Sequence, residues 1–226
     1  MEVYLESGAK RVFAGALDWP GWSRSGRDEE GALEALVAYA PRYALAVRGA
    51  VTPAFRVPDS LSDLHVVERL TGDATTDFGA PSIAPSVDGR TLAAKDFARL
   101  RALLHATWSA FDRAVAEAEG VELTKGPRGG GRDVNAIVTH VVDAEGAYAR
   151  RLGPKRPAVD EGDGIEHHRA VVLDSLDRGF ADGLPAAGPR GGKIWAIPYF
   201  VRRAGWHVLD HAWEIEDRST ARRGRR

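Results

Sequence analysis

The sequence contains no cysteine, which limits the chemistry available to its 226 residues. Disulfides, thiolate metal ligands and a cysteine nucleophile carried by the protein are all excluded. Any bound metal must therefore be held by histidine and carboxylate side chains. Thiol chemistry would need a thiol that is supplied from outside the chain.

Long apolar runs and an excess of one charge are also absent. No stretch of eighteen apolar residues occurs, and the opening residues MEVYLESGAKR lack a basic leader followed by an apolar core and a cleavage site. The net charge is −1, so no overall field draws the chain toward nucleic acid or an anionic membrane. We therefore expect a cytoplasmic protein with no membrane span and no specific nucleic-acid partner.

The first part of the chain has the pattern of a mixed α+β unit. Short β-like stretches bounded by turn residues are expected as strands at 3–5, 12–14 and 64–70. Asp28, Glu29 and Glu30 place carboxylates where a helix begins, ahead of apolar residues at helical spacing. A loop rich in Gly, Pro, Ser and Asp is expected at 72–89.

Helical periodicity replaces this pattern from about residue 92. Four segments carry apolar residues at helical spacing: 94–119, 132–152, 164–181 and 198–217. Asp133 is a candidate N-cap of the second segment, and four such helices joined by loops predict a four-helix bundle. The predicted fold is an α+β unit at 1–90, an all-α four-helix bundle at 91–218 and a basic disordered tail at 219–226.

Three of the seven histidines form a pattern typical of a metal site. His207 and His211 are four residues apart on the expected fourth helix, so both imidazoles project from one face. The glutamate of the zinc-protease motif H-E-x-x-H is missing, because Val208 follows His207. His140 lies in an apolar run of the second helix, and such ligands meet in the core of a bundle.

The other four histidines have ordinary structural explanations. His65 is expected to pack across strands, and His105 on the first helix could face the bundle interior. His167 and His168 are adjacent, so on a helix they point about 100° apart and cannot easily chelate one ion.

Several charged residues are candidates for binding a substrate or orienting a ligand. The string GPRGG occurs twice, and Arg128 and Arg190 in its two copies could bind an anionic group. A permissive connection between helices is the alternative, and the frequency of Gly-Arg loops favours it. Arg203 and Glu214 share the helix face of the histidine pair, where Glu214 either orients an imidazole or forms an ordinary salt bridge.

Residues 92–218 resemble the DinB-like superfamily of four-helix metalloproteins. The matching pieces are KGPRGGGRD, IVTHVVDAEGAYARRLG and RRAGWHVLDHAWEIEDR. The family takes one histidine of its triad from the second helix and two from the fourth, and those positions are His140, His207 and His211 here. The resemblance implies a divalent metal, with zinc expected first and nickel, iron or manganese as alternatives.

The amino-terminal sequence is similar to HicB-like domains. The segment YLESGAKRVFAGALDWPGWSRSGRDEEGALEAL has their order of two strands, a D-x-P-G turn and a helix with acidic residues at its start. The turn is Asp18-Trp19-Pro20-Gly21 in this chain. The similarity implies an accessory or interaction domain, and no toxin-binding residue can be assigned from the turn alone.

The DinB-like resemblance implies a metal-dependent thiol S-transferase. Three histidine ligands leave coordination positions open, which is typical of catalytic sites. The enzyme would activate a low-molecular-weight thiol, such as mycothiol or bacillithiol, for transfer to an electrophile, and Arg128, Arg190 and Arg203 would bind anionic groups of the substrate. The alternatives are a metal-dependent hydrolase and a non-catalytic stress or regulatory protein that binds metal. The oligomeric state stays open, with a homodimer among the options.

Overall fold

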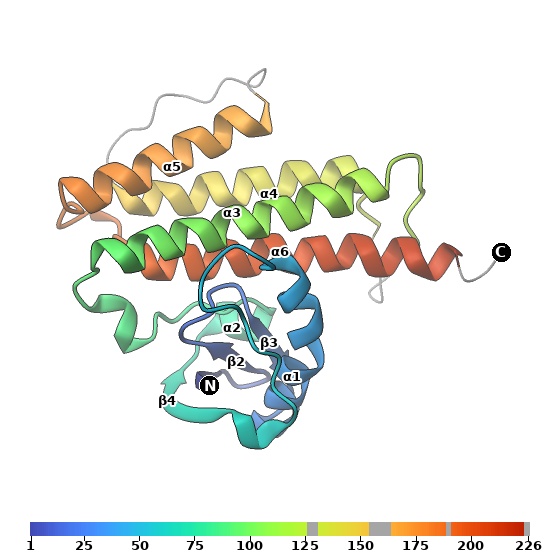
Figure 1. The fold of residues 1–226 in the computed structure, drawn as a ribbon, viewed down its shortest axis with the longest axis horizontal. Coiled ribbons are helices and arrows are strands. Elements are labelled where there is room, and N and C mark those ends of the chain that lie inside the picture. Colours follow the sequence, from blue (N-terminus) through green and yellow to red (C-terminus); the bar gives the residue numbers. More distant parts are fainter. Residues whose placement is uncertain (126–130, 154–163, 189–190, 224–226) are drawn as a thin grey trace. The chain divides into compact units, whose positions relative to one another are not determined.

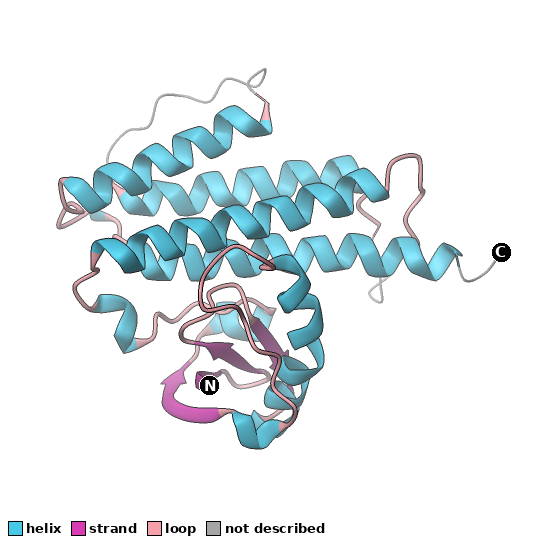
Figure 2. Cartoon of the chain, in the orientation of Figure 1, coloured by secondary structure: helices cyan, strands magenta, loops and turns pink. Residues whose placement is uncertain are grey.

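The computed structural model describes residues 1–125, 131–153, 164–188 and 191–223. The chain forms two compact units, the first made of Met1–Thr107 with Val201–Trp206 and the second of Trp108–Phe200 with His207–Arg226. Strands occur near the amino terminus and helices dominate the rest of the described chain (Figures 1 and 2). The predicted α+β class is confirmed as a small sheet near the amino terminus followed mostly by helices. No helix within the described ranges is long and apolar enough to cross a membrane.

The first unit contains a mixed sheet in the order β3-β2-β1-β4. Its strands are β1 Glu2–Ser7, β2 Val12–Ala16, β3 Ser23–Gly26 and β4 His65–Thr71. β1 and β2 are antiparallel, as the predicted turn between them requires, whereas β4 pairs with β1 in parallel. β3 was not predicted, because its polar sequence SRSG carries no strand signal and its pairing with β2 is a tertiary event.

Helix α1 (Glu29–Ala46) begins where the acidic residues predicted a helix start. The Asp28 side chain caps it by accepting a hydrogen bond of 2.8 Å from the Gly31 amide. The helix packs on β2 and β3, and it holds the turn at 18–21 because the buried Tyr43 hydroxyl donates to the Pro20 carbonyl at 2.9 Å. Gly21 in this turn has a φ of 93°, which favours glycine.

The segment at 72–89, predicted to be a loop, contains more structure than expected. Helix α2 (Ala74–Phe78) lies within it, and a short 3-10 turn spans Ser86–Gly89. Asp73 caps α2 with a reciprocal capping box that involves Thr76. A helix of five residues is too short to show the periodicity on which the sequence prediction depends.

A buried carboxylate joins β1 to this segment. Glu6 is fully buried and accepts hydrogen bonds from the Thr76 hydroxyl and from the amides of Ser82 and Ile83. Burial raises the pKa of Glu6 above its ordinary value of 4.5, and these three hydrogen bonds oppose the shift without cancelling it. The charged side chain is therefore less favourable in the folded state than in the unfolded state.

We expect Glu6 to make the fold less stable as the pH rises. Between the unfolded pKa of about 4.5 and the raised folded pKa, the folded state binds more protons than the unfolded state. The free energy of unfolding therefore falls through this window and then stays level. Urea denaturation of the wild type and of Glu6→Gln, from about pH 4 to 8, should show this as a falling difference between the two proteins. A difference that is constant or rises with pH would contradict the assignment.

The predicted helical segments correspond to four long helices: α3 Ala94–Glu117, α4 Val134–Ala149, α5 Ile165–Ala181 and α6 Ile197–Arg223. Asp133 caps α4 as predicted, since its side chain accepts from the Ala136 amide at 2.8 Å. The predicted tail at 219–226 differs from the structure, because α6 continues through Arg223. Neither glycine nor proline interrupts the chain between Gly205 and Gly224, so nothing local ends the helix at 218.

The predicted boundary at residue 90 also differs from the division into units. The first unit extends through α3 to Thr107 and includes Val201–Trp206 of α6. A buried ion pair explains this, because Arg202 donates to both carboxylate oxygens of Asp88 at 3.0 and 2.8 Å. Arg202 also donates to the carbonyls of Ala16 and Leu17. The sequence pattern separates sheet from helices, whereas these contacts attach one turn of α6 to the sheet unit.

Candidate metal centre

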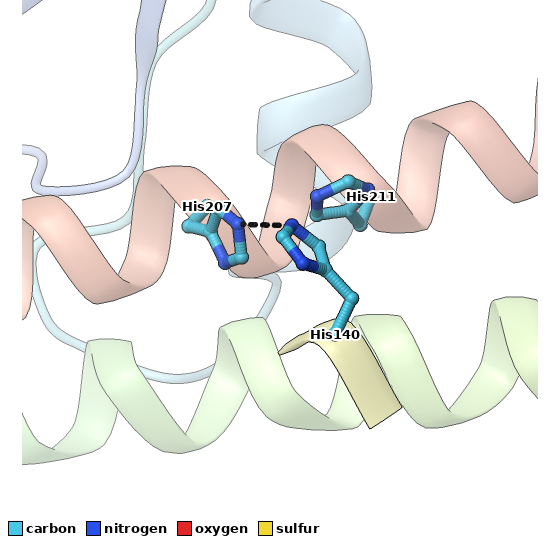
Figure 3. Close-up of side chains that lie close together, drawn as sticks. All are labelled: His140, His207 and His211. Carbon is cyan, nitrogen blue, oxygen red and sulfur yellow. Dashed lines mark hydrogen bonds between the residues drawn. The ribbon is translucent and has the colours of Figure 1, made fainter. Parts of the chain in front are cut away.

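Three histidine rings converge within the second unit. His140 comes from α4, while His207 and His211 come from successive turns of α6 (Figure 3). Their ring centroids are separated by 5.0 Å for His140 and His207, 4.9 Å for His140 and His211, and 4.6 Å for His207 and His211. The spacing of four residues therefore places His207 and His211 on one face of α6, as the sequence predicted. Helix α4 supplies the third ring, His140.

The ring nitrogens have separations that suit a shared cation. The Nε2 atoms of His140 and His207 are 3.2 Å apart, and one nitrogen from each of the three histidines lies within 4.8 Å of the others. Four-coordinate Zn²⁺ holds imidazole nitrogens at about 2.0–2.1 Å, which places two of them about 3.4 Å apart. His140 and His207 are close to this spacing, and a nitrogen of His211 lies within 4.8 Å of a nitrogen of each. The three side chains therefore fit a small divalent ion.

Burial favours the neutral form of His140. His207 is buried and only 12% of the His211 side chain is exposed, while His140 is half-buried. Burial lowers the pKa of His140 below its ordinary value, and the nearby His211 and Arg132 lower it further. A neutral imidazole has the nitrogen lone pair that a metal needs.

The hydrogen bond between His140 and His207 has a direct consequence for metal binding. Two neutral imidazoles joined through their Nε2 atoms must have a proton on one of these atoms. An ion can bind both atoms only after that proton has left or moved to the other ring nitrogen. Metal uptake at this pair therefore requires a change of tautomer or the release of a proton.

Glu214 defines the tautomer of His211. The Glu214 Oε2 atom lies 2.8 Å from His211 Nδ1. The hydrogen bond with His211, and then the charge of His211 and contact with Arg218, lower the pKa of Glu214, although partial burial opposes this. An ionised carboxylate only accepts hydrogen bonds, so Nδ1 carries a proton, and in the neutral form of His211 the lone pair is on Nε2. Glu214 contacts both His211 and Arg218, so orientation of a ligand and an ordinary salt bridge are both compatible with its position, and its role stays a prediction.

The remaining candidate residues lie in different surroundings. Arg203 is buried and its guanidinium lies 4.7 Å from the centre of the Trp206 ring, so it stacks on an aromatic side chain. Its role in substrate binding stays a prediction. Arg128 and Arg190 lie outside the described residues.

Comparison with known proteins gives no match for this chain among family models, curated proteins or solved structures. The case for a metal centre therefore stands on the three imidazoles and on the side chains that surround them.

The other histidines do not join the site. His65 and His105 are exposed, so His105 does not face a core, and His65 is paired with Glu2 across β4 and β1. His168 is buried, with its Nε2 atom 3.1 Å from Glu145, and the Trp108 indole donates to the other Glu145 oxygen at 2.8 Å. This buried group could not be predicted from the sequence, because its members come from three separate helices.

Tyr148, Trp195 and Arg218 were not predicted to belong to the surroundings of the triad. The Tyr148 ring lies 5.7 Å from the His207 ring and 5.4 Å from the Trp195 ring. Arg218 donates to Glu214 at 2.7 Å. A signal for Arg218 was present, because positions 207, 211, 214 and 218 follow the alternating spacing of four and three residues that lines one face of a helix.

Proposed function

We propose that the second unit is part of a DinB-like four-helix bundle that binds a divalent metal at His140, His207 and His211. The observation that carries the proposal is the convergence of three imidazole nitrogens within 4.8 Å. Zinc is the first candidate, because three nitrogen ligands with an open fourth position are typical of catalytic zinc sites. The absence of cysteine leaves histidine and carboxylate side chains as the possible ligands, and the lack of a glutamate after His207 argues against a zinc protease.

We propose that the reaction is transfer of a low-molecular-weight thiol to an electrophile. When bound, a divalent ion supplies a positive charge that favours the deprotonated form of a coordinated thiol. Three neutral imidazoles leave that charge undiminished, whereas carboxylate ligands would reduce it. The three histidines hold the ion. Glu214 keeps a proton on Nδ1 of His211, so that Nε2 is the nitrogen that binds the ion.

Aromatic side chains beside His207 favour an electrophile with apolar surface. Tyr148 and Trp195 are both half-buried, and their rings are tilted by 34° to each other. The Trp195 amide donates to the Arg151 carbonyl at 2.8 Å, which holds this residue in place. Such rings offer a planar, apolar surface next to the ligands. Arg203, together with Arg128 and Arg190, is proposed to bind anionic groups of the substrates.

We propose a HicB-like accessory role for the amino-terminal residues. The support is the order of β1, β2, a D-x-P-G turn, the short strand β3 and an acid-capped helix, with the Pro20 carbonyl of the turn hydrogen-bonded to Tyr43 of α1. This role carries no part of the proposed chemistry.

The proposal predicts metal-dependent consumption of a thiol. Zinc-loaded protein should consume mycothiol, bacillithiol, glutathione or cysteine in the presence of chlorodinitrobenzene, and removal of the zinc should abolish this activity. His140→Ala should abolish it as well, because it removes one of the three ligands. His65→Ala is the matched control, since His65 is exposed on β4. Thiol loss is followed with a colorimetric thiol reagent.

Two outcomes would contradict the transferase. Metal-dependent hydrolysis of an ester or amide, with every thiol inactive, would favour the hydrolase. Stable metal binding without any turnover would favour a regulatory metal-binding protein.

A further inference from the structure

We propose that Arg218 is a positioning residue of the metal centre, which acts through Glu214 to orient His211. The inference rests on the proposed function, because orientation of His211 matters to chemistry only if this side chain is a ligand. Arg218 was assigned no role from the sequence, and it touches none of the three histidines in the contacts described above.

The two oxygens of Glu214 have different partners. Oε2 accepts from His211 Nδ1 at 2.8 Å, and Oε1 accepts from the Arg218 guanidinium at 2.7 Å. The carboxylate is therefore held at both ends, although 35% of its side chain is exposed. A carboxylate held only by His211 could rotate about its own bonds toward water. The contact with Arg218 removes that freedom before a metal binds.

Arg218 is itself held by backbone atoms. Only 8% of its side chain is exposed, and it donates to the carbonyls of Thr124 at 2.7 Å and Arg132 at 2.8 Å. In return, the Thr124 hydroxyl and amide donate to the Arg218 carbonyl at 3.0 and 3.3 Å. A planar guanidinium has donors pointing in several directions, so one side chain can bind the carboxylate and both carbonyls together.

These contacts link the two helices that carry the histidines. Arg132 directly precedes Asp133, the N-cap of α4, and α4 carries His140. Glu214 and Arg218 lie on α6, one and two turns beyond His211. A chain of hydrogen bonds therefore runs from the start of α4 through Arg218 and Glu214 to the imidazole of His211. It fixes the tautomer in which neutral His211 has its lone pair on Nε2.

Arg218→Gln tests this role, with zinc affinity as the main measurement. Glutamine is shorter, uncharged and unable to span the carboxylate and both carbonyls, so we expect the zinc dissociation constant to rise by about 10-fold, as outer partners of ligands usually cause. Affinity is measured by competition with a chromogenic chelator. The visible spectrum of the Co²⁺-loaded protein should change too, because it reports the geometry of the ligands.

Arg169→Gln is the matched control. Arg169 is also 8% exposed in its side chain and forms two hydrogen bonds of 2.7 Å with the carboxylate of Asp112. Arg169 belongs to the same unit as Arg218, but none of its contacts described here involves the three histidines. Both substitutions should lower the melting temperature, whereas only Arg218→Gln should weaken zinc binding. Equal zinc affinity in the wild type and Arg218→Gln would overturn the inference.

A double substitution tests whether Arg218 acts through Glu214. If it does, Glu214→Gln with Arg218→Gln should bind zinc about as weakly as Glu214→Gln alone, because the second change has no remaining route to His211. Losses that add on a logarithmic scale would overturn the proposed route. If Arg218→Gln does not fold, Arg218→Lys replaces it, since lysine keeps the charge but loses the fork.

Failure of this inference is distinguishable from failure of the proposed function. A wild type that binds no zinc contradicts the metal centre itself. In that case the inference is tested on metal-free protein, where ¹⁵N NMR should show a single Nδ1–H tautomer of His211 in the wild type and a mixture in Arg218→Gln. A single tautomer in both proteins would overturn it.

Discussion

Replacement of His207 and His211 by alanine is expected to remove metal binding almost completely. The wild type, reconstituted with zinc and freed of excess metal, should contain about one ion per chain, and the double variant should contain only a background amount. The substitution leaves His140 as a single imidazole. We expect the affinity to fall by at least about a thousand-fold, beyond the 10–100-fold cost of losing an outer partner.

The matched control separates loss of ligands from loss of histidine in general. His65 is exposed on β4, so His65→Ala should retain the full zinc content. Metal content is measured by elemental analysis, and circular dichroism shows whether each variant keeps its helices. Unchanged metal content in the double variant would place the ion elsewhere. A wild type that stays metal-free after reconstitution would contradict the site.

Asp88→Ala is expected to destabilise the protein by about 3–5 kcal/mol, the usual cost of leaving one partner of a buried ion pair alone. The side chains of Asp88 and Arg202 are only 2% and 7% exposed. Without the carboxylate, the guanidinium keeps the carbonyls of Ala16 and Leu17 but loses the negative charge that balances it. The midpoint of urea denaturation should fall accordingly.

An exposed ion pair provides the comparison. Arg69 and Glu29 also form hydrogen bonds, at 3.0 Å, but their side chains are 60% and 43% exposed. Glu29→Ala should therefore have a much smaller effect than Asp88→Ala, because water already solvates both charges. A second comparison is Asp88→Leu with Arg202→Met, which should recover part of the loss by replacing the buried charges with apolar side chains. Equal effects of Asp88→Ala and Glu29→Ala would contradict the argument.

The elements with strong local signals were predicted well. One helix start was predicted from the carboxylates at 28–30 and another from the candidate N-cap Asp133, and the structure places a hydrogen-bonded cap at Asp28 and at Asp133. The four long helices follow the apolar periodicity of the chain closely. β3 and α2 were missed because they are short and polar, and their formation depends on pairing and packing with other segments.

The sequence by itself determined that His207 and His211 share one face of a helix. It also determined that no thiolate of the protein itself takes part, because the chain contains no cysteine. Both conclusions depend on residue identity and on positions a few residues apart. Helical geometry is the same wherever a helix forms. Two residues four positions apart on a helix therefore share a face, whatever the rest of the fold.

Only the tertiary structure decided which distant residues meet. His140 and His207 are 67 positions apart, and Arg202 and Asp88 are 114 apart. Arg218 contacts Thr124 and Arg132, whereas the sequence predicts only that the bundle ends at this position. These contacts depend on how each helix is rotated about its axis and on the rotamer of each side chain. Periodicity specifies which face of a helix is apolar, but the partner of that face is selected by packing across the whole fold.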